Sequence, residues 1–255
     1  MKHLRSPVVV VVLILGSCVS ACAQSEITLI APGSIRVSIE QLIPAFESKT
    51  GIKVKASFGQ GIRIQQQIAK GEVFDVPIMQ EPYPEVLASG NVVASSATAL
   101  ASVLVVAAVR RGAPKPDIST PQAVKRMLLA AKSISYPDPP GGSATGANFK
   151  ETLKRLEITD QMQPKTKAAQ GGGDAMVMVA KGEVDIGFAF LSEAKDQPDI
   201  DVVGPLPREI STPTTLVGFV SSHAKDPASA RALLDYLSSP DAAPVYKAQG
   251  MRLGR

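Results

Sequence analysis

The sequence has very few of the side chains that most often act as nucleophiles or bases. Its only cysteines are Cys18 and Cys22, and its only histidines are His3 and His223. From Gln24 onward the chain therefore has no cysteine, can form no disulfide bond, and keeps a single histidine with no partner at metal-ligand spacing. These absences disfavour thiol and imidazole chemistry. We predict that the chain is not an enzyme and has no catalytic residue, no metal site and no cofactor.

Aromatic and basic side chains are also sparse. Tryptophan is absent, aromatic residues make up 4% of the chain, and no basic run is longer than Arg110-Arg111. Stacking platforms for sugars or single-stranded nucleic acid need aromatic side chains, and binding to a phosphate backbone needs clustered positive charge. We therefore expect no nucleic-acid partner. The 255 residues, 45% of them apolar, are enough for one large core or two small ones, and we favour two lobes.

The amino terminus has the pattern of a secretory signal peptide. Lys2 and Arg5 precede an apolar run over residues 8–16, which is too short for a bilayer-spanning helix of about 20 residues. We predict a signal peptide over residues 1–23, with cleavage after Ala23, and a periplasmic location. An alternative reading is that residues 19–22 form a lipobox, in which case the protein would be lipid-anchored at Cys22.

Strand and helix patterns alternate along the rest of the chain, which predicts an α/β fold. Pro44 interrupts the first helical pattern, so this helix is either kinked there or begins near Ser38. The predicted strands are residues 27–30, 52–56, 76–79, 103–109, 133–136, 186–190, 202–203 and 216–220. The predicted helices cover residues 35–46, 62–69, 147–156 and 228–237, and another begins at Pro121.

A short internal repeat indicates that the two lobes are similar. The sequence Ala-Lys-Gly-Glu-Val occurs at residues 69–73 and again at residues 180–184. Each copy lies where a helix ends and a strand follows, and Gly61 and Gly172 both stand eight residues before the shared alanine. The matching context favours two equivalent α/β units over chance identity.

Four loops have the same form, in which a strand is followed by small or polar residues and then by a helix. They are residues 32–34, 59–61, 141–145 and 171–174. Free backbone amides at helix starts bind anions, because each start carries about half a positive elementary charge. Any one of these loops is most simply a cap or a turn. As a set facing one cleft, they predict a site for a small anion.

Only a few side chains near these loops suggest specific chemistry. Arg63 lies one turn inside the second loop, where it could pair with a carboxylate or oxyanion or point outward to solvent. The run at residues 141–146 completes neither a nucleophile elbow nor a P-loop, so turnover of phosphate esters is disfavoured. A secreted enzyme with this sequence would have to work with carboxylates such as Asp138 or Asp174.

Several segments together resemble one known family over nearly the whole mature chain. They are residues 31–34, 57–58, 68–71, 74–76, 149–156, 187–190 and 235–237. In their order and spacing the chain resembles the bacterial periplasmic molybdate-binding proteins, which are solute-binding components of ABC importers. The resemblance implies a type II periplasmic binding protein fold, with two lobes of mostly parallel sheet joined by a hinge. Lobe I would comprise residues 24–102 and 217–255, and lobe II residues 103–216.

The resemblance also implies a ligand site in the cleft between the lobes. The positions that match the family's binding residues are Ser34, Gly61, Thr145, Gly172 and Phe190, to which the loop analysis adds Arg63. Gly61 stands where the family has a serine, and Phe190 where it has a tyrosine hydroxyl. Two lost donors would weaken molybdate binding by roughly 1 to 3 kcal/mol each. An organic anion bound with the help of Arg63 is then as plausible as molybdate.

The function that we expect from the sequence is capture of a small anion, a molybdate-like oxyanion or an organic anion, for an ABC importer. The partners would be the solute and the membrane permease, and the protein would be a monomer. One alternative is a secreted sensory module that binds the same kind of ligand. The other is a secreted enzyme that uses carboxylates.

Overall fold

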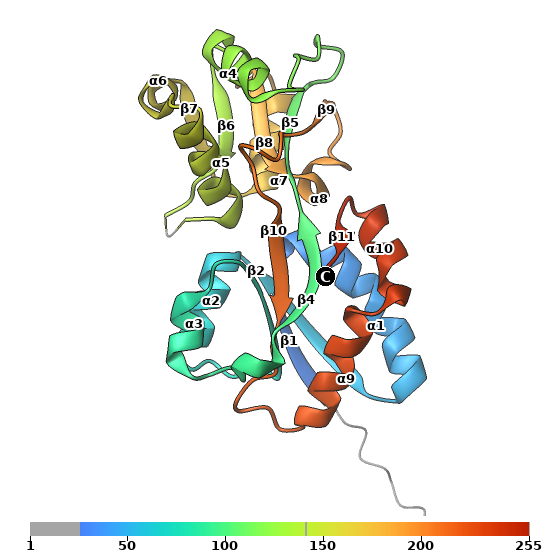
Figure 1. Ribbon diagram of the computed structural model, residues 1–255. Helices are drawn as coiled ribbons and strands as arrows, with labels where there is room; N and C mark the ends of the chain where they lie inside the picture. The colour runs from blue at the N-terminus through green and yellow to red at the C-terminus, as the bar shows by residue number, and fades with distance from the viewer. Residues whose placement is uncertain (1–25, 141, 255) are drawn as a thin grey trace, which may run out of the picture.

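The protein forms two α/β lobes, one above the other (Figure 1). The computed structural model describes residues 26–140 and 142–254. The predicted signal peptide and Cys22 lie outside the described residues. Each lobe has one sheet with helices against it, which confirms the predicted α/β class and two-lobed architecture. Within the described ranges no helix is both long and apolar enough to cross a membrane.

The sheet of the first lobe, lobe I, has six strands in the order β11-β4-β10-β3-β1-β2. These strands are β1 (Glu26–Pro32), β2 (Lys53–Gly59), β3 (Val76–Gln80), β4 (Thr98–Val103), β10 (Thr214–Gly218) and β11 (Arg252–Leu253). Its helices are α1 (Arg36–Thr50), α2 (Gly61–Ala69), α3 (Pro84–Ser89), α9 (Pro227–Leu237) and α10 (Ala243–Ala248), with short 3-10 turns η1 (Gly33–Ile35), η2 (Ala94–Ser96) and η4 (Pro240–Ala242). Helix α1 contains Pro44 and runs on to Thr50.

The sheet of the second lobe, lobe II, has five strands in the order β7-β6-β8-β5-β9. These strands are β5 (Val105–Arg110), β6 (Ile134–Pro137), β7 (Thr166–Ala169), β8 (Ile186–Phe190) and β9 (Ile200–Pro205). Its helices are α4 (Pro121–Ala130), α5 (Ala144–Arg155), α6 (Thr159–Met162), α7 (Gly172–Ala180) and α8 (Leu191–Ala194), with the 3-10 turn η3 (Gln163–Lys165). Helix α4 begins at Pro121, as predicted, and Thr120 caps it, its hydroxyl accepting the Ala123 N–H.

Both sheets are mixed rather than mostly parallel. In lobe I, β1 pairs in parallel with β2 and β3, whereas β10 runs antiparallel to β3 and β4. In lobe II, β6 pairs in parallel with β7 and β8, whereas β5 runs antiparallel to β8 and β9. Strand β5, by which the chain enters lobe II, and strand β10, by which it returns to lobe I, are thus antiparallel to their neighbours, as is the short β11 beside β4. Each lobe also has a parallel βαβ core.

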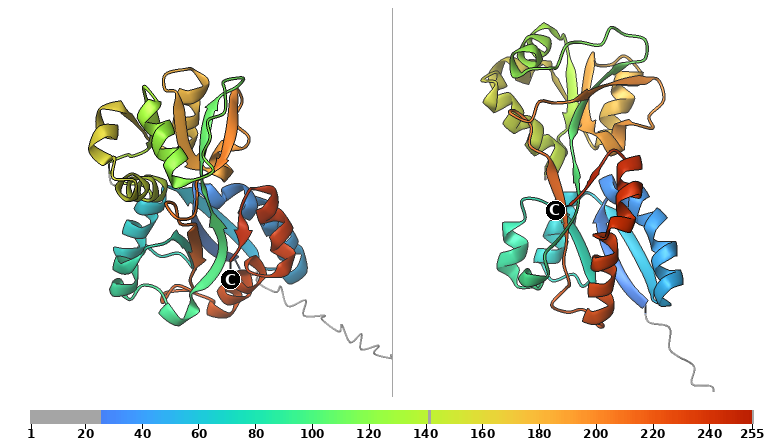
Figure 2. Two further views of the ribbon diagram at one scale, coloured as in Figure 1. Left: turned by 45° about the horizontal axis from the view of Figure 1, so that its top comes forward. Right: turned by 45° about the vertical axis from the view of Figure 1, so that its right-hand side comes forward.

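The chain passes from one sheet to the other at two places, visible at the waist of the molecule (Figure 2). The first is Leu104, which separates β4 from β5. The single strand predicted over residues 103–109 is therefore wrong at its start, because that apolar run contains the end of a lobe I strand and all of a lobe II strand. The second crossing follows β9, and β10 then pairs with β3 through Leu216 and Val217. Since β10 begins at Thr214, this return to the lobe I sheet lies before the expected boundary at residues 216 and 217.

The internal repeat marks equivalent parts of the two lobes. Helix α2 begins at Gly61 and ends at Ala69, and α7 begins at Gly172 and ends at Ala180, so both have nine residues. Each is followed by a glycine with positive φ, Gly71 at 91° and Gly182 at 73°. Strands β3 and β8, with five residues each, come next, and each pairs in parallel with the first strand of its βαβ unit. By this equivalence Gln80 and Phe190 end corresponding strands.

A cluster of aromatic rings stabilises lobe II, and the hydrogen bonds of a buried carboxylate stabilise lobe I. In lobe II, Phe149 lies fully buried with its ring 4.0 Å from that of Phe188 and 4.9 Å from that of Tyr136. In lobe I, Asp75 accepts the N–H and the hydroxyl of Thr28 and the N–H of Lys225. Burial alone would raise the pKa of Asp75, but these hydrogen bonds lower it below its ordinary value.

Candidate functional site

A cavity of about 260 Å³ lies between the lobes, at the carboxyl ends of the parallel strands. We call it the interlobe cavity. Its lining comes from all four predicted loops and from the ends of β3 and β8. From lobe I it is lined by Pro32, Gly33, Ser34, Gly59, Gln60, Gly61 and Gln80, and from lobe II by Pro137, Pro139, Gly142, Ser143, Ala144, Thr145, Gln170, Gly171, Gly172, Asp174, Phe190 and Glu193.

The structure brings most of the predicted binding residues together. The residues of the predicted set that line the interlobe cavity are Ser34, Gly61, Thr145, Gly172 and Phe190. Arg63 does not line it. Its exposed side chain lies on the outer side of α2, in a groove with Gln66 and Lys70. Arg63 stands two residues after Gly61, the first residue of α2, and two residues correspond to a rotation of about 200° around the helix axis, away from the cleft. A role for Arg63 in anion recognition at the cleft finds no support in this placement.

In lobe I, a side chain absent from the predicted set occupies the wall of the cavity. The Gln80 side chain is 5% exposed, and its Nε2 donates to the Ser34 hydroxyl at 3.1 Å. Its Oε1 lies so close to Gly61 that a Cβ added there would collide with it. Gln80 thus fills the space in which a side chain at position 61 would stand.

In lobe II, the carboxyl group of Glu193 lies against Gly172, as the Gln80 side chain lies against Gly61 in lobe I. Phe190 donates its N–H to Glu193 Oε2 at 3.2 Å, and the carboxyl group lies where a Cβ on Gly172 would be. Burial raises the pKa of Glu193 to about 7, outweighing the hydrogen bonds from the Phe190 and Gly172 amides, which lower it. Glu193 is also among the residues that line the interlobe cavity. At neutral pH it is thus divided between its acid and base forms.

The raised pKa of Glu193 predicts that stability depends on pH. Between its ordinary value of 4.5 and about 7, this carboxyl group is protonated in the folded protein and ionised in the unfolded chain. Folding then binds a proton, so the free energy of unfolding falls as pH rises through this window, by up to about 3 kcal/mol. Urea titrations at pH 5 and pH 8 should show this loss for the wild type relative to Glu193→Gln. Parallel losses in both proteins would contradict it.

Sequence reasoning missed Gln80 and Glu193 because neither belongs to a loop with a recognisable motif. Two signals pointed to them. Gly61 and Gly172 are the first residues of their helices and have no positive φ, so they are glycines for lack of space rather than for backbone conformation. The repeat also places Gln80 at the end of the strand equivalent to the one that Phe190 ends.

The electrostatic character of the interlobe cavity comes from two carboxyl groups and three helix starts. Asp174 and Glu193 line it, and the described part of the lining contains no lysine, arginine or histidine. Helices α2, α5 and α7 begin at it, and their first N–H groups favour negative charge. Asp138, the other carboxylate considered from the sequence, pairs instead with Lys150 at 2.8 Å. The carboxyl groups available to a bound molecule are those of Asp174 and Glu193.

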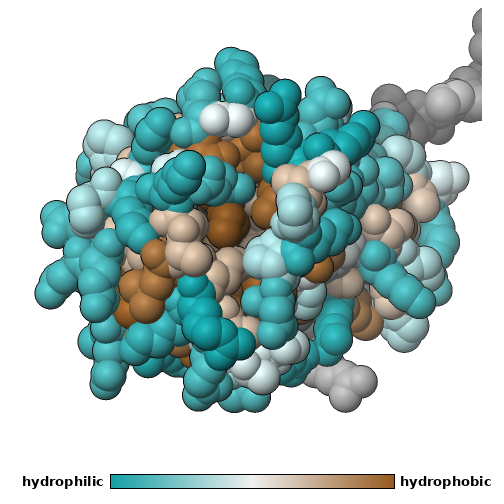
Figure 3. Space-filling view, turned by 90° about the horizontal axis from the view of Figure 1, so that it is seen from above, coloured by the Kyte–Doolittle hydropathy of each residue, from teal (hydrophilic) through white to brown (hydrophobic). Residues whose placement is uncertain are grey.

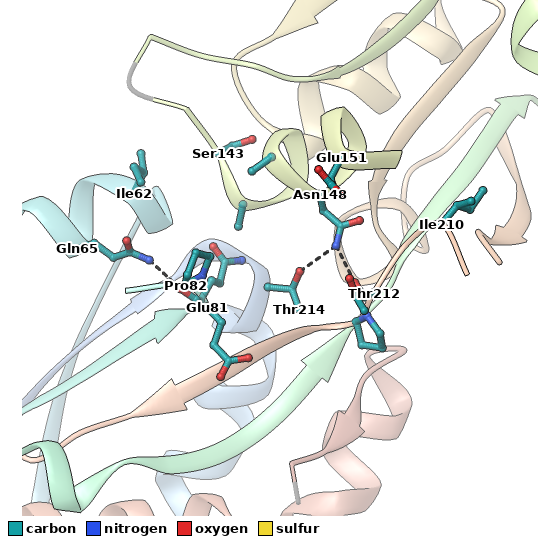
Figure 4. A pocket seen from close by; sticks show the side chains of 14 residues that line it. Ile62, Gln65, Glu81, Pro82, Ser143, Asn148, Glu151, Ile210, Thr212 and Thr214 are labelled. Atoms are coloured by element: carbon teal, nitrogen blue, oxygen red, sulfur yellow. Dashed lines mark hydrogen bonds between the residues drawn. The ribbon is translucent and has the colours of Figure 1, made fainter. Parts of the chain in front are cut away.

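A larger cavity of about 590 Å³ adjoins the interlobe cavity and shares Gln80, Ser143 and Ala144 with it (Figure 4). On its lobe I side, Gln65 donates to the Gln80 carbonyl at 2.7 Å. On its lobe II side, Asn148 donates to the Thr212 carbonyl at 2.6 Å and so ties α5 to the second crossing segment. The interlobe cavity therefore opens on this side into a wider space between the lobes.

A separate hollow lies at the far end of lobe II. Viewed from above, apolar side chains show there between polar ones (Figure 3). A cavity of about 420 Å³ includes Val109, Met127, Val184 and Ile186 in its lining, with Arg110 and Asp185 among the polar residues. It lies at the opposite end of β6 and β8 from the interlobe cavity and shares no lining residue with it.

The chain matches a known protein family over nearly all of its described residues. A family model described as "Bacterial extracellular solute-binding protein" matches residues 27–252. The chain belongs to this family. The resemblance to periplasmic molybdate-binding proteins is confirmed: this chain is 28% identical over 249 residues to the molybdate-binding protein ModA of Azotobacter vinelandii, covering 95% of this chain and 96% of that one. The structure of the Azotobacter vinelandii periplasmic molybdate-binding protein superposes with a TM-score of 0.72 at 22% identity, covering 90% of this chain and all of that one.

Another relative corrects one prediction. The chain is 34% identical over 235 residues to a protein named aconitate isomerase from a Pseudomonas species, covering 89% of this chain and 88% of that one. An enzyme is thus found among close relatives with this architecture, and the prediction that the chain is not an enzyme is wrong. The prediction relied on the scarcity of histidine and cysteine, but a carboxyl group whose pKa is near 7 can also transfer protons.

Proposed function

We propose that this protein is a periplasmic isomerase that interconverts the cis and trans isomers of aconitate, or of a closely similar unsaturated organic acid, in the interlobe cavity. The observation that carries the proposal is that Glu193 lines the cavity, against Gly172 and the Phe190 amide, and has a pKa raised to about 7. General bases work best when their pKa lies near the working pH. The activity named for the Pseudomonas relative supports the same reaction class.

The reaction needs a proton to leave one carbon atom and return to another. Aconitate has a methylene group between a carboxylate and a carbon–carbon double bond, so removal of a methylene proton gives a carbanion delocalised over three carbons. Return of a proton to the far carbon moves the double bond and gives either geometric isomer of the same compound. Substrate and product have the same formula, and no oxidant, reductant or water is consumed. A single carboxylate can take a proton from one carbon and, after exchange with solvent, deliver a proton to the other.

The cavity supplies what this chemistry requires. The starts of α2, α5 and α7 and the hydroxyl groups of Ser34 and Thr145 offer donors for substrate carboxylates. Its volume of about 260 Å³ is near the lower end, roughly 300 Å³, of the usual range for small-molecule sites. Glu193 would act as the base, and Asp174, across the start of α7, as the second acidic group near the substrate.

A second function is favoured by the similarity to molybdate-binding proteins over nearly the whole chain. In this alternative the protein captures a small anion in the same cavity and delivers it, as a monomer, to the membrane permease of an ABC importer. The family description supports an extracytoplasmic solute receptor in general. This alternative requires that the protein bind the anion tightly and leave it chemically unchanged. One experiment can therefore distinguish the receptor from the isomerase.

The experiment is incubation of the purified protein with cis-aconitate and, separately, with trans-aconitate, followed by chromatography of the two isomers. We expect both reactions to approach the same isomer ratio, at rates proportional to protein concentration. A thermal-shift titration with the same acids is run alongside. Stabilisation by aconitate without any interconversion would contradict the isomerase and support the receptor.

A further inference from the structure

Gln80 is the most deeply buried polar side chain of the interlobe cavity that the isomerase mechanism does not use. It ends β3, is 5% exposed, and is shared by the interlobe cavity and the larger adjoining one. A buried amide is normally retained where it makes hydrogen bonds. Its Nε2 bonds to Ser34 Oγ, which leaves its second N–H available to a molecule in the cavity.

The hydrogen bond to Gln80 also determines what Ser34 can do. Because Ser34 Oγ accepts from Gln80, its own O–H is free to act as a donor. Ser34 is 7% exposed and lines the interlobe cavity, as Gln80 does. The two side chains together present a hydroxyl donor and an amide donor side by side, an arrangement that fits the two oxygen atoms of a carboxylate.

Gly61 makes this arrangement possible. A Cβ at position 61 would collide with Gln80 Oε1, although the backbone at Gly61 has no positive φ and would accept alanine. The equivalent Gly172 makes the same room for Glu193 in lobe II. The two lobes therefore have the same arrangement. A glycine at the start of a helix leaves room for a longer side chain from later in the chain, which is the Gln80 amide in lobe I and the Glu193 carboxyl group in lobe II.

From this geometry we infer that Gln80, with Ser34, binds one carboxylate of the substrate and thereby determines which solutes the cavity accepts. The inference builds on the proposed isomerase. A carboxylate held on the lobe I wall would direct the neighbouring methylene group toward Glu193 on the lobe II wall. A compact tetrahedral dianion such as molybdate is disfavoured, because Glu193 occupies the Phe190 and Gly172 amides and places negative charge beside them.

The test measures binding of propane-1,2,3-tricarboxylate, a saturated analogue that cannot isomerise, by calorimetry. Gln80→Leu keeps the size of the side chain and removes the amide. We expect it to weaken binding at least about tenfold, as for loss of a hydrogen bond to a charged group. Gly61→Ala displaces Gln80 and should cause a loss of similar size, and the double variant should lose no more than either single one. The matched control is Gln66→Leu, which changes an exposed glutamine of α2, the helix that begins at Gly61.

The outcomes distinguish this inference from the proposed function. With aconitate as substrate, Gln80→Leu should raise KM and leave kcat within about threefold, since the base is intact. Binding by Gln80→Leu within twofold of the wild type, or multiplied losses in the double variant, would overturn the role of Gln80. Loss of binding in these variants with no isomerisation by the wild type would support Gln80 and refute the isomerase. Tight wild-type binding of molybdate in place of the tricarboxylate would overturn both.

Discussion

Glu193→Gln is expected to slow the interconversion of aconitate isomers by at least about 100-fold, the lower range for loss of a general base. The substitution keeps the shape of the side chain but removes the group that accepts the proton. Substrate binding should change much less, because the donors of the lobe I wall are untouched. The measurement is kcat and KM for both isomers, with Glu183→Gln, an exposed glutamate on the turn after α7, as the control.

The pH dependence of the wild type should identify the same group. Since the base form of Glu193 is required, kcat/KM should rise with pH and level off above an apparent pKa of about 7. A glutamine variant that retains full activity, or a wild-type profile that is flat between pH 5 and 8, would remove Glu193 from the mechanism. Asp174 would then be the carboxylate of the cavity to examine next.

Phe149→Ala is expected to lower the free energy of unfolding by about 3 to 5 kcal/mol. Phe149 is fully buried between the rings of Phe188 and Tyr136, and truncation leaves a cavity among side chains that lie on different elements. Because β6 and β8 end at the interlobe cavity, the loss should also disturb the loops that line it. Urea denaturation provides the measurement.

Val177→Ala serves as the comparison for this packing prediction. Val177 lies on α7 with 39% of its surface exposed, so its truncation should change stability by no more than about 0.5 kcal/mol. Phe149→Leu should retain most of the stability that alanine loses. Equal effects of Phe149→Ala and Val177→Ala would mean that the aromatic cluster is not the centre of the lobe II core.

The broad fold followed from the sequence because its signals are local. Strand runs, helix spacing and the repeated Ala-Lys-Gly-Glu-Val segment are patterns of neighbouring residues, and they located α2, α7, β3 and β8 closely. The family resemblance implied a change of lobe between residues 102 and 103, but the apolar pattern itself did not show the break at Leu104. The residues on both sides of it are apolar and buried, so their pattern is the same whether the chain stays in one sheet or changes to another.

The sequence predicted the candidate site only in part, for a related reason. Ser34, Gly61, Thr145 and Gly172 lie in loops that have local signals, and the family resemblance added Phe190. All five line the interlobe cavity. The residues that give this cavity its own chemistry do not have such signals. Gln80 reaches it from the end of β3 and Glu193 from α8. Only the tertiary packing against Gly61 and Gly172 shows that they fill the missing side-chain positions.

The most direct test of the account is proton NMR of cis-aconitate in D₂O with the purified wild-type protein and with Glu193→Gln. A base that removes a methylene proton exchanges it with solvent, so deuterium should enter the aconitate carbon skeleton as the trans isomer appears. The account predicts both changes with the wild type and neither with the variant. Unchanged aconitate in the presence of the wild type, or isomerisation that proceeds equally well in Glu193→Gln, would contradict it.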